Sequence, residues 1–252
     1  MTESRRVALV TGGARGIGAG IATALAAAGY SVAINYRSHE REAAQLAAGI
    51  VAAGGEALAV AGDVADAAAV ARMVARVEEE LGPVTILINN AALTDTHKPW
   101  HEIDEAEWDA VMAVNLKSCF LCFRAVYPAM RAAGWGRVVN ISSVTFLLGR
   151  PHLVHYIASK AGMIGFTRGL AREVGGEGIT VNAVTPGAIR TEAELEMFPD
   201  QEGIGSWLAT AQSVPRRGLP DDIAAAVTYL VSDGAAFVTG QTLNVDGGWA
   251  MH

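Results

Sequence analysis

The chain has 252 residues, of which 51% are hydrophobic and 18% are charged, and its formal net charge is −7. This composition is typical of a folded globular protein and excludes an intrinsically disordered chain. The acidic balance argues against a nucleic-acid-binding protein, because such a protein would carry a basic face.

The first predicted element is the apolar run Val7–Val10, which follows a short polar and basic start. This run is too short for the apolar core of a signal peptide. Later apolar stretches are broken by Gly, Ser or Asn well before the ~20 residues that a membrane span needs. We therefore expect a cytoplasmic protein that does not bind a membrane.

Short β-branched runs alternate with longer alanine-rich segments along the rest of the chain. The runs are almost continuously apolar, which is typical of parallel strands covered on both faces. They predict strands at 7–10, 31–35, 57–61, 86–89, 138–141, 180–184 and 242–245. The alanine-rich segments predict helices at about 16–28, 39–53, 66–80, 105–133, 155–174 and 221–231.

This alternation predicts an α/β fold: a single Rossmann-type doubly wound domain over residues 1–252, with a seven-stranded parallel sheet flanked by helices on both faces. The segment 190–215 is longer than an ordinary connection, and long insertions are often lids. Its apolar side chains stand among acidic ones and are Leu195, Met197, Phe198, Ile204, Trp207 and Leu208. We predict a substrate lid at about 190–215.

A glycine-rich turn, Thr11-Gly12-Gly13-Ala14-Arg15-Gly16-Ile17-Gly18, connects the first predicted strand to the first helix. Its glycines would let the backbone approach a pyrophosphate, while the helix N-terminus offers free N–H groups. The spacing is GxxxGxG, and differs from the GxGxxG of the common dinucleotide fingerprint. The alternative is a plain tight turn, but the position between strand and helix favours a dinucleotide site.

The end of the second predicted strand indicates which dinucleotide would bind. An NAD site usually places an acid about 20 residues after the glycines, where it accepts from the ribose 2′-OH. Here the strand ends Ile34-Asn35-Tyr36-Arg37-Ser38, without an acid. Arg37 and Arg15 together would suit a 2′-phosphate. We predict NADP(H) in preference to NAD(H); the alternative is a pair of solvated surface arginines.

Cys119 and Cys122 form a C-x-x-C motif. A redox pair needs an exposed, reactive thiol, whereas these cysteines lie in an apolar stretch of a predicted helix. Packing in the core is therefore favoured over redox chemistry. No metal site is predicted, because the cysteines and histidines lack the spacing of metal ligands.

Tyr156 and Lys160 are four residues apart on a predicted helix and so share a face. A tyrosine pKa of about 10 is too high for a base at neutral pH, and a neighbouring ammonium would lower it. The pair would then give a proton to a ketone or take one from an alcohol. Ser143 follows the strand 138–141, at the edge where such sheets bind ligands, and would hydrogen-bond the substrate oxygen.

Together these motifs resemble the short-chain dehydrogenase/reductase family from Val7 to Gly248. Besides the glycine turn, the resemblance rests on Asp63-Val64, Asn89-Asn90-Ala91, Asn115, Ser143, Tyr156, Lys160, Pro186-Gly187, Thr239-Gly240-Gln241 and Val245-Asp246-Gly247-Gly248. It implies an NAD(P)-dependent oxidoreductase that acts on CH–OH groups by transfer of the pro-S hydride. It also implies a homotetramer.

The resemblance implies a role for each matching position. Tyr156 would be the acid/base and Ser143 would polarise the substrate carbonyl. Lys160 would lower the pKa of Tyr156 and bind the nicotinamide ribose, and Asn115 would interrupt its helix and hold a water that connects Lys160 to solvent. The cofactor residues are then Tyr156 and Lys160 with Gly12, Arg15, Gly16, Ile17, Gly18, Tyr36, Arg37, Asp63, Val64, Asn90, Ala91, Pro186, Gly187, Ile189 and Thr191. Among these, Asp63 would bind the adenine, and Ile189 and Thr191 the carboxamide.

One position departs from the family pattern, because Asn-Asn-Ala-Gly is Asn89-Asn90-Ala91-Ala92 here. If the backbone at Ala92 needs a positive φ, alanine would cost on the order of 1 kcal/mol. We expect a small local adjustment that leaves cofactor binding intact.

The sequence leaves two substrate classes open. The stretches Asn35-Tyr36-Arg37-Ser38 and Leu170-Ala171-Arg172-Glu173 resemble bacterial 3-oxoacyl-(acyl carrier protein) reductases, and Arg168 and Arg172 would attract an acidic carrier protein. The acidic lid would repel that carrier, and its residues Met197, Phe198 and Trp207 favour a small apolar or aromatic ketone. The stretch from His155 to Lys160 and the ending Asp246-Gly247-Gly248 also resemble secondary-alcohol dehydrogenases. A non-catalytic NADP(H)-sensing module is a distant alternative, because a sensor does not need the four catalytic residues.

Overall fold

The computed structural model describes residues 5–94, 97–197 and 200–251. Over these residues, seven strands form one sheet in the order β3-β2-β1-β4-β5-β6-β7, and each neighbouring pair is parallel. The strands are β1 Val7–Val10, β2 Ser31–Tyr36, β3 Glu56–Ala61, β4 Val84–Asn89, β5 Gly136–Ile141, β6 Ile179–Pro186 and β7 Thr242–Val245. The predicted fold class is confirmed.

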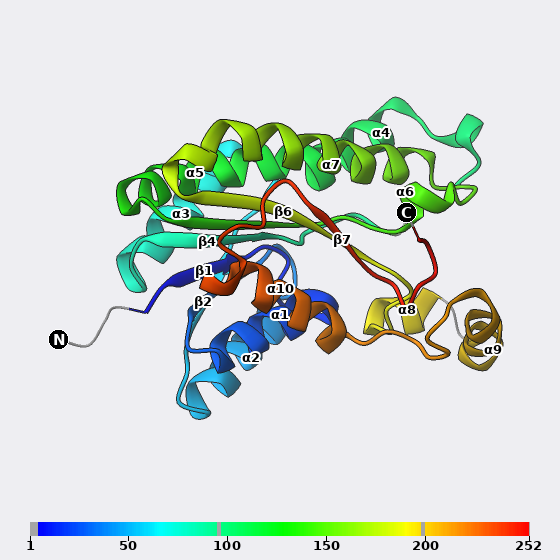
Figure 1. Cartoon of the computed structure of the whole chain (residues 1–252), viewed down its shortest axis with the longest axis horizontal. Helices are drawn as coiled ribbons and strands as arrows, with labels where there is room; N and C mark the ends of the chain where they lie inside the picture. Colours follow the sequence, from blue (N-terminus) through cyan, green and yellow to red (C-terminus); the bar gives the residue numbers. More distant parts are fainter. Residues whose placement is uncertain (1–4, 95–96, 198–199, 252) are drawn as a thin grey trace.

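Helices cover both faces of the sheet, as Figure 1 shows. One face carries α3 Ala67–Glu80, α4 Glu105–Met112, α5 Ser118–Ala133 and α7 Val154–Val174. The other face carries α1 Gly16–Ala27, α2 Glu40–Ala52 and α10 Pro220–Val231. Three short helices lie at one end of the sheet, and they are α6 Thr145–Leu148, α8 Glu192–Met197 and α9 Gln201–Ala211.

The apolar strands pack side chains on both of their faces. In β1, Leu9 belongs to the apolar cluster that includes residues of α3, α5 and α7, whereas Val10 belongs to the cluster that includes residues of α1 and α10. Both side chains are completely buried. Because successive strand residues point to opposite faces, a strand covered on both sides needs the continuous apolar run seen in the sequence.

The predicted helix at 105–133 is divided by a π-helical turn, Ala113–Lys117. Asn115 lies in this turn and is fully buried. The Leu93 N–H donates to Asn115 Oδ1 at 2.7 Å, and Asn115 Nδ2 donates to the Leu93 carbonyl at 3.2 Å. Such π turns widen the helix locally and are frequent at functional sites. The interruption that the resemblance implies at Asn115 is therefore present.

The stretch Glu105–Ala133 is 29 residues long, and its most apolar window reaches a mean hydropathy of 1.3. Length and composition alone would let it cross a membrane. In the fold, however, this stretch packs against β4 and α7, and Val126 and Met130 have no exposed surface. The protein core already covers these apolar side chains.

The segment 190–215 is largely helical, since it contains α8 and α9. Trp207 of α9 packs edge to face on Trp249, with the ring centroids 5.4 Å apart. The Arg150 guanidinium lies 6.0 Å from the centroid of the Trp249 ring. This segment therefore meets the end of the described chain at Trp249, and Trp249 in turn lies near the loop after α6. Phe198, predicted for the same segment, lies outside the described residues.

The strand order places β1 and β4 side by side at the point where the direction of strand addition reverses. The chain builds β2 and β3 on one side of β1, and β4 to β7 on the other. Loops diverge at such a reversal and leave a crevice outside the carboxyl ends of the strands, where open α/β sheets bind ligands. The glycine turn after β1 and the residues after β4 flank this crevice.

Candidate active site

The glycine turn after β1 is packed too closely to accept side chains. Gly12 has a φ of +60°, and a Cβ there would lie 2.9 Å from the Ala91 Cα. A Cβ on Gly18 would lie 2.4 Å from the Gly12 carbonyl oxygen. Because α1 begins at Gly16, its first N–H groups have no helical partners and are available to an anion. The turn therefore has the geometry of a phosphate cradle.

Two asparagines hold this turn in place. The Gly12 N–H donates to Asn35 Oδ1 at 3.2 Å, and Asn35 Nδ2 donates to the Gly62 carbonyl at 3.0 Å. Asn90 Nδ2 donates to the carbonyls of Thr11 and Gly12, at 3.0 Å each. The sequence reasoning missed Asn35; its signal is a polar residue, 1% exposed, inside an apolar strand.

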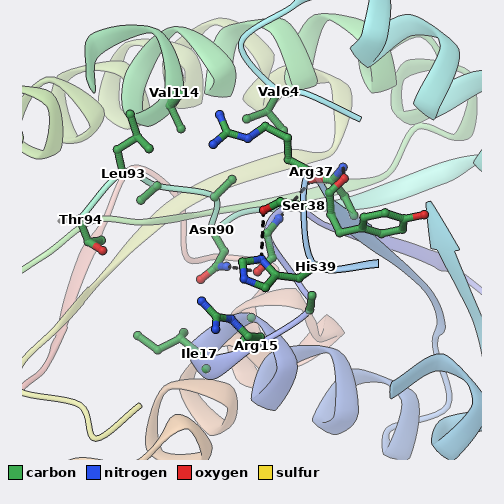
Figure 2. Close-up of a pocket in the computed structure, with 18 of the residues that line it drawn as sticks. Arg15, Ile17, Arg37, Ser38, His39, Val64, Asn90, Leu93, Thr94 and Val114 are labelled. Carbon is green, nitrogen blue, oxygen red and sulfur yellow. Dashed lines mark hydrogen bonds between the residues drawn. The ribbon is translucent and has the colours of Figure 1, made fainter. Parts of the chain in front are cut away.

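A pocket of about 340 Å³ lies in the crevice (Figure 2). The predicted cofactor residues that line it are Gly12, Arg15, Gly16, Ile17, Gly18, Tyr36, Arg37, Asp63, Val64, Asn90, Ala91 and Thr191. Residues without a predicted role that also line it are Ala14, Asn35, Ser38, His39, Gly62, Ala92, Leu93, Thr94, Val114 and Glu192. The pocket therefore extends from the ends of β2 and β3, past the glycine turn, to the start of α8. This length suits one elongated ligand.

Arg15 and Arg37 reach the pocket from the glycine turn and from the end of β2, with His39 between them in Figure 2. The Arg37 guanidinium lies 4.0 Å from the Asp63 carboxylate and is more than half exposed. The Ser38 hydroxyl lies 3.3 Å from His39 Nδ1. The two guanidiniums with their neighbouring hydroxyl and imidazole suit a phosphate group. The sequence reasoning missed Ser38 and His39, although both follow Arg37 directly.

Ala92 lines the pocket without strain. Among the described residues, His152 is the only residue other than glycine with a positive φ. The backbone at Ala92 therefore avoids the region in which an alanine is penalised. Replacing the family's glycine with Ala92 therefore adds no backbone strain.

Three predicted cofactor residues at and after the end of β6 do not line this pocket. Pro186 ends β6 and pairs with Val245, and a Cβ on Gly187 would lie 2.7 Å from the Asp246 Cα. Ile189 is buried and faces a second, smaller pocket. Thr191 does line the first pocket, and its hydroxyl oxygen accepts from the Glu194 N–H at 3.3 Å, where α8 begins.

Tyr156 and Lys160 lie on α7, with Lys160 Nζ 5.7 Å from the centroid of the Tyr156 ring. Lys160 Nζ donates to the Ile141 carbonyl at 2.7 Å. Burial lowers the pKa of Lys160 to about 8, because the ammonium is desolvated. Burial also raises the pKa of Tyr156, and a hydrogen bond with Ser143 opposes that rise.

The pKa of Tyr156 is raised, which contradicts the expectation that Lys160 lowers it. Desolvation penalises the phenolate and is the largest influence on this group. The phenol therefore keeps its proton at neutral pH, which is the state of a proton donor.

Two serines follow β5, and their contacts distinguish them. Ser142 Oγ donates to the Lys160 carbonyl at 2.9 Å and so ties the strand end to α7. Ser143 contacts the Tyr156 phenol instead. Ser143 Oγ also accepts from the Thr145 N–H at 3.2 Å and from the Thr145 hydroxyl at 2.9 Å. The sequence reasoning gave Thr145 no role.

Asn115 connects the π turn to the catalytic helix. Its Nδ2 donates to Ser159 Oγ at 3.1 Å, and Ser159 Oγ donates to the Tyr156 carbonyl at 2.7 Å. Asn115, Ser143, Tyr156 and Lys160 do not themselves line the pocket, but Leu93, which is hydrogen-bonded to Asn115, does. The catalytic candidates thus gather beside the pocket. The implied water between Asn115 and Lys160 stays a prediction.

Cys119 and Cys122 are free and buried. Burial raises the pKa of Cys119 to about 11 and that of Cys122 to about 12. Thiols in this state are unreactive. Within the described residues, no three His, Cys, Asp or Glu side chains gather in a way that could hold a metal ion.

A family model described as "Enoyl-(Acyl carrier protein) reductase" matches residues 12–250. The chain belongs to the short-chain dehydrogenase/reductase family. It is therefore an oxidoreductase that acts on CH–OH groups and the corresponding carbonyls.

Members of the family resemble the chain over almost its whole length. The "Nodulation protein G" of Azospirillum brasilense is 43% identical over 97% of this chain and 98% of its own. A 3-oxoacyl-[acyl-carrier-protein] reductase of Synechocystis is 41% identical, with 98% of this chain and 97% of its own covered. The acetoacetyl-CoA reductase of Shinella zoogloeoides is 41% identical over 96% of this chain and 98% of its own.

The fold also matches a solved structure. The crystal structure of a blue fluorescent protein from a metagenomic library, in complex with NADPH, superposes with a TM-score of 0.90. It is 38% identical, and the match covers 98% of each chain. This chain can also hold a dinucleotide. Its glycine turn leaves open a space that any side chain at those glycines would fill, and the pocket lies beside that turn.

Proposed function

We propose that this dehydrogenase/reductase uses NADP(H) to interconvert a ketone and a secondary alcohol. The observation that carries the proposal is the gathering of the Tyr156 phenol, Ser143 and a buried Lys160, with the Lys160 Nζ 5.7 Å from the centroid of the Tyr156 ring. These groups stand beside a pocket whose glycine turn suits a pyrophosphate. When bound, the nicotinamide cofactor supplies the hydride.

In the reducing direction, Ser143 donates a hydrogen bond to the ketone oxygen and stabilises the charge that develops there. Tyr156 transfers its phenolic proton to the same oxygen as a general acid. The Lys160 ammonium then stabilises the phenolate that remains. In the oxidising direction, the phenolate takes the hydroxyl proton of the alcohol.

The substitution Tyr156→Phe tests this role, because it removes the proton donor and keeps the ring. We expect ketone-dependent NADPH oxidation to fall at least ~100-fold, the lower end of what a general acid contributes. NADPH binding, followed by its fluorescence, should change less than about twofold. An unchanged rate would remove Tyr156 as the acid, and a wild type that reduces no ketone would favour the sensing module.

The preference for NADP(H) is supported by Arg15 and Arg37, with Ser38 and His39 beside them. The substitution Arg37→Asp should raise the KM for NADPH at least ~10-fold, because it replaces a favourable charge near the 2′-phosphate with a repulsive one. The KM for NADH should change much less, since NADH lacks that phosphate. Untouched NADPH kinetics would contradict the assignment.

For the substrate we propose a 3-oxoacyl thioester, supported by relatives named for 3-oxoacyl-[acyl-carrier-protein] and acetoacetyl-CoA reduction. A small aromatic ketone is the second candidate, favoured by the Trp207–Trp249 pair. Comparing kcat/KM for NADPH oxidation with an acetoacetyl thioester and with an aromatic ketone decides between them. A higher value for the aromatic ketone would overturn the thioester assignment.

We also propose that α8 and α9 act as a substrate lid.

We propose further that the chain is a cytoplasmic homotetramer. Apolar side chains left in water support an assembly: Trp108 is 39% exposed on α4, and Phe120 is 49% exposed on α5. Sedimentation velocity should give about four times the mass of one chain, and a clean monomer would contradict this assembly.

A further inference from the structure

Ser143 has the hydrogen-bonding capacity of any hydroxyl, which is one donor and two acceptor positions. A backbone N–H can only donate, so the Thr145 N–H, 3.2 Å away, fills one acceptor position. The Thr145 hydroxyl, 2.9 Å away, fills the other. The remaining capacity of Ser143 is its own O–H, which is left for the hydrogen bond with the Tyr156 phenol.

Thr145 is held rigidly where it makes these contacts. It is the first residue of α6, and the Gly149 N–H donates to its carbonyl at 2.9 Å. The residue before it, Val144, is 1% exposed. The Val144 N–H donates to the Pro186 carbonyl at 3.1 Å, which ties this turn to the end of β6. The turn after β5 therefore cannot easily move away from Ser143.

We infer that Thr145 is a positioning residue, which fills both acceptor positions of Ser143 Oγ and so directs the single Ser143 proton toward Tyr156 and the substrate oxygen. This role rests on the proposed function, because it assigns Ser143 the hydrogen bond to the substrate carbonyl. Without the Thr145 hydroxyl, the Ser143 hydroxyl could rotate and donate elsewhere. Fewer molecules would then present the hydrogen bond that the transition state needs.

The matched test is Thr145→Val against Thr145→Ser. Valine keeps the volume and the β-branch but removes the hydroxyl, whereas serine keeps the hydroxyl. We expect kcat for ketone reduction to fall about 5- to 10-fold in T145V, the range that one net hydrogen bond provides. The KM should change less than about twofold, and T145S should stay within about twofold of the wild type.

A double-mutant cycle with Ser143→Ala separates positioning from a merely structural role. Because Thr145 acts through Ser143, T145V should cause no further loss of kcat in the S143A background. An equal loss with and without Ser143 would overturn the proposal.

A second readout does not depend on turnover. The pKa of Tyr156 can be titrated from phenolate absorbance, as the difference between each protein and its Tyr156→Phe counterpart. T145V should raise this pKa when Ser143 is present and leave it unchanged in S143A, because only an oriented Ser143 proton stabilises the phenolate. If this pattern holds while no ketone is reduced, the proposed function fails and the positioning role stands. If T145V leaves the pKa unchanged when Ser143 is present, the positioning role fails.

Discussion

Lys160 has 2% of its surface exposed, although an ammonium at that depth is costly unless it is hydrogen-bonded. Its Nζ donates to the Ile141 carbonyl, and its own carbonyl accepts from Ser142. The end of β5 thus holds Lys160 through both its ammonium and its backbone carbonyl, while burial lowers the pKa of the ammonium to about 8. The ammonium next to Tyr156 therefore costs stability in the folded state.

The cost of this buried charge depends on pH. Below pH 8 both the folded and the unfolded states hold the Lys160 proton, so the folded state bears the whole cost. Between the folded pKa of about 8 and the ordinary lysine value of 10.5, the folded state releases the proton and the unfolded state retains it. The free energy of unfolding should therefore rise with pH across this window.

Lys160→Met removes the ionisable group and keeps an unbranched side chain. Relative to this variant, the wild type should gain about 3 kcal/mol of unfolding free energy from pH 7 to pH 10.5, since one pKa unit corresponds to about 1.4 kcal/mol. Urea unfolding at several pH values measures the difference. The exposed Lys117 gives the control K117M, whose difference from the wild type should stay flat. A flat difference for K160M as well would contradict the buried-charge account.

The two serines show what the sequence could and could not predict at the residue scale. The position after a strand pointed to Ser143, and its contact with Tyr156 agrees with that choice. The partners of Ser143 and Asn115, which are Thr145 and Ser159, gave no signal, because each lies in an ordinary polar position. Similarly, the sequence suggested an ammonium near the phenol but not the desolvation that raises the pKa of Tyr156.

At the scale of elements, strong periodic patterns predicted well and short or interrupted ones did not. The apolar centre of β5 was predicted, but its first residues, Gly136 and Arg137, were not. Arg137 is 3% exposed and tolerates burial because its Nη1 donates to the carbonyls of Gly136 and Gly178. The helices α8 and α9 were missed because α8 has only six residues and α9 contains two glycines.

One ion pair links the α8–α9 segment to the chain before α10. Arg217 Nη2 pairs with Glu194 of α8, and the two side chains are only 11% and 18% exposed. Arg217 Nη1 donates to Gln201 Oε1 of α9 at 3.1 Å, and its Nε donates to the Ala188 carbonyl at 3.4 Å. A single guanidinium thus joins both helices to the backbone that follows β6.

Reversing either charge should release this segment, because an unpaired charge at a mostly buried position is strongly unfavourable. We expect Arg217→Glu and Glu194→Arg each to speed proteolytic cleavage within 190–215 and to raise the ketone KM about 10-fold. The double variant, with the charges exchanged, should recover most of both effects. The control Arg216→Gln removes a guanidinium that pairs with Asp222 of α10 and should leave cleavage of the segment unchanged. Failure of the double variant to recover would show that the pair does not hold the segment.

At the scale of the whole molecule, the sheet order follows from the alternation of strands and helices in the sequence. Right-handed crossovers leave few other arrangements, and the reversal between β1 and β4 then determines where the pocket lies. The contacts made by the C-terminal end of the chain could not be predicted in this way. The contact of Trp249 with Trp207 and Arg150 joins three segments that are far apart in sequence, and no local pattern predicts such a meeting.

The buried cysteines allow a test of whether this molecule unfolds only globally or whether α5 also opens locally. Cys119 and Cys122 are 1% and 0% exposed in the core beneath α5, so a thiol reagent should label them only after global unfolding. A cofactor that binds only the folded state should then slow labelling about 100-fold when present at 100 times its Kd. Mass spectrometry, with Cys122→Ala to assign the sites, measures both rates at low reagent concentration, where refolding outpaces labelling. Rapid labelling of the native protein, or labelling that the bound cofactor does not slow, would show instead that α5 opens locally while the pocket stays formed.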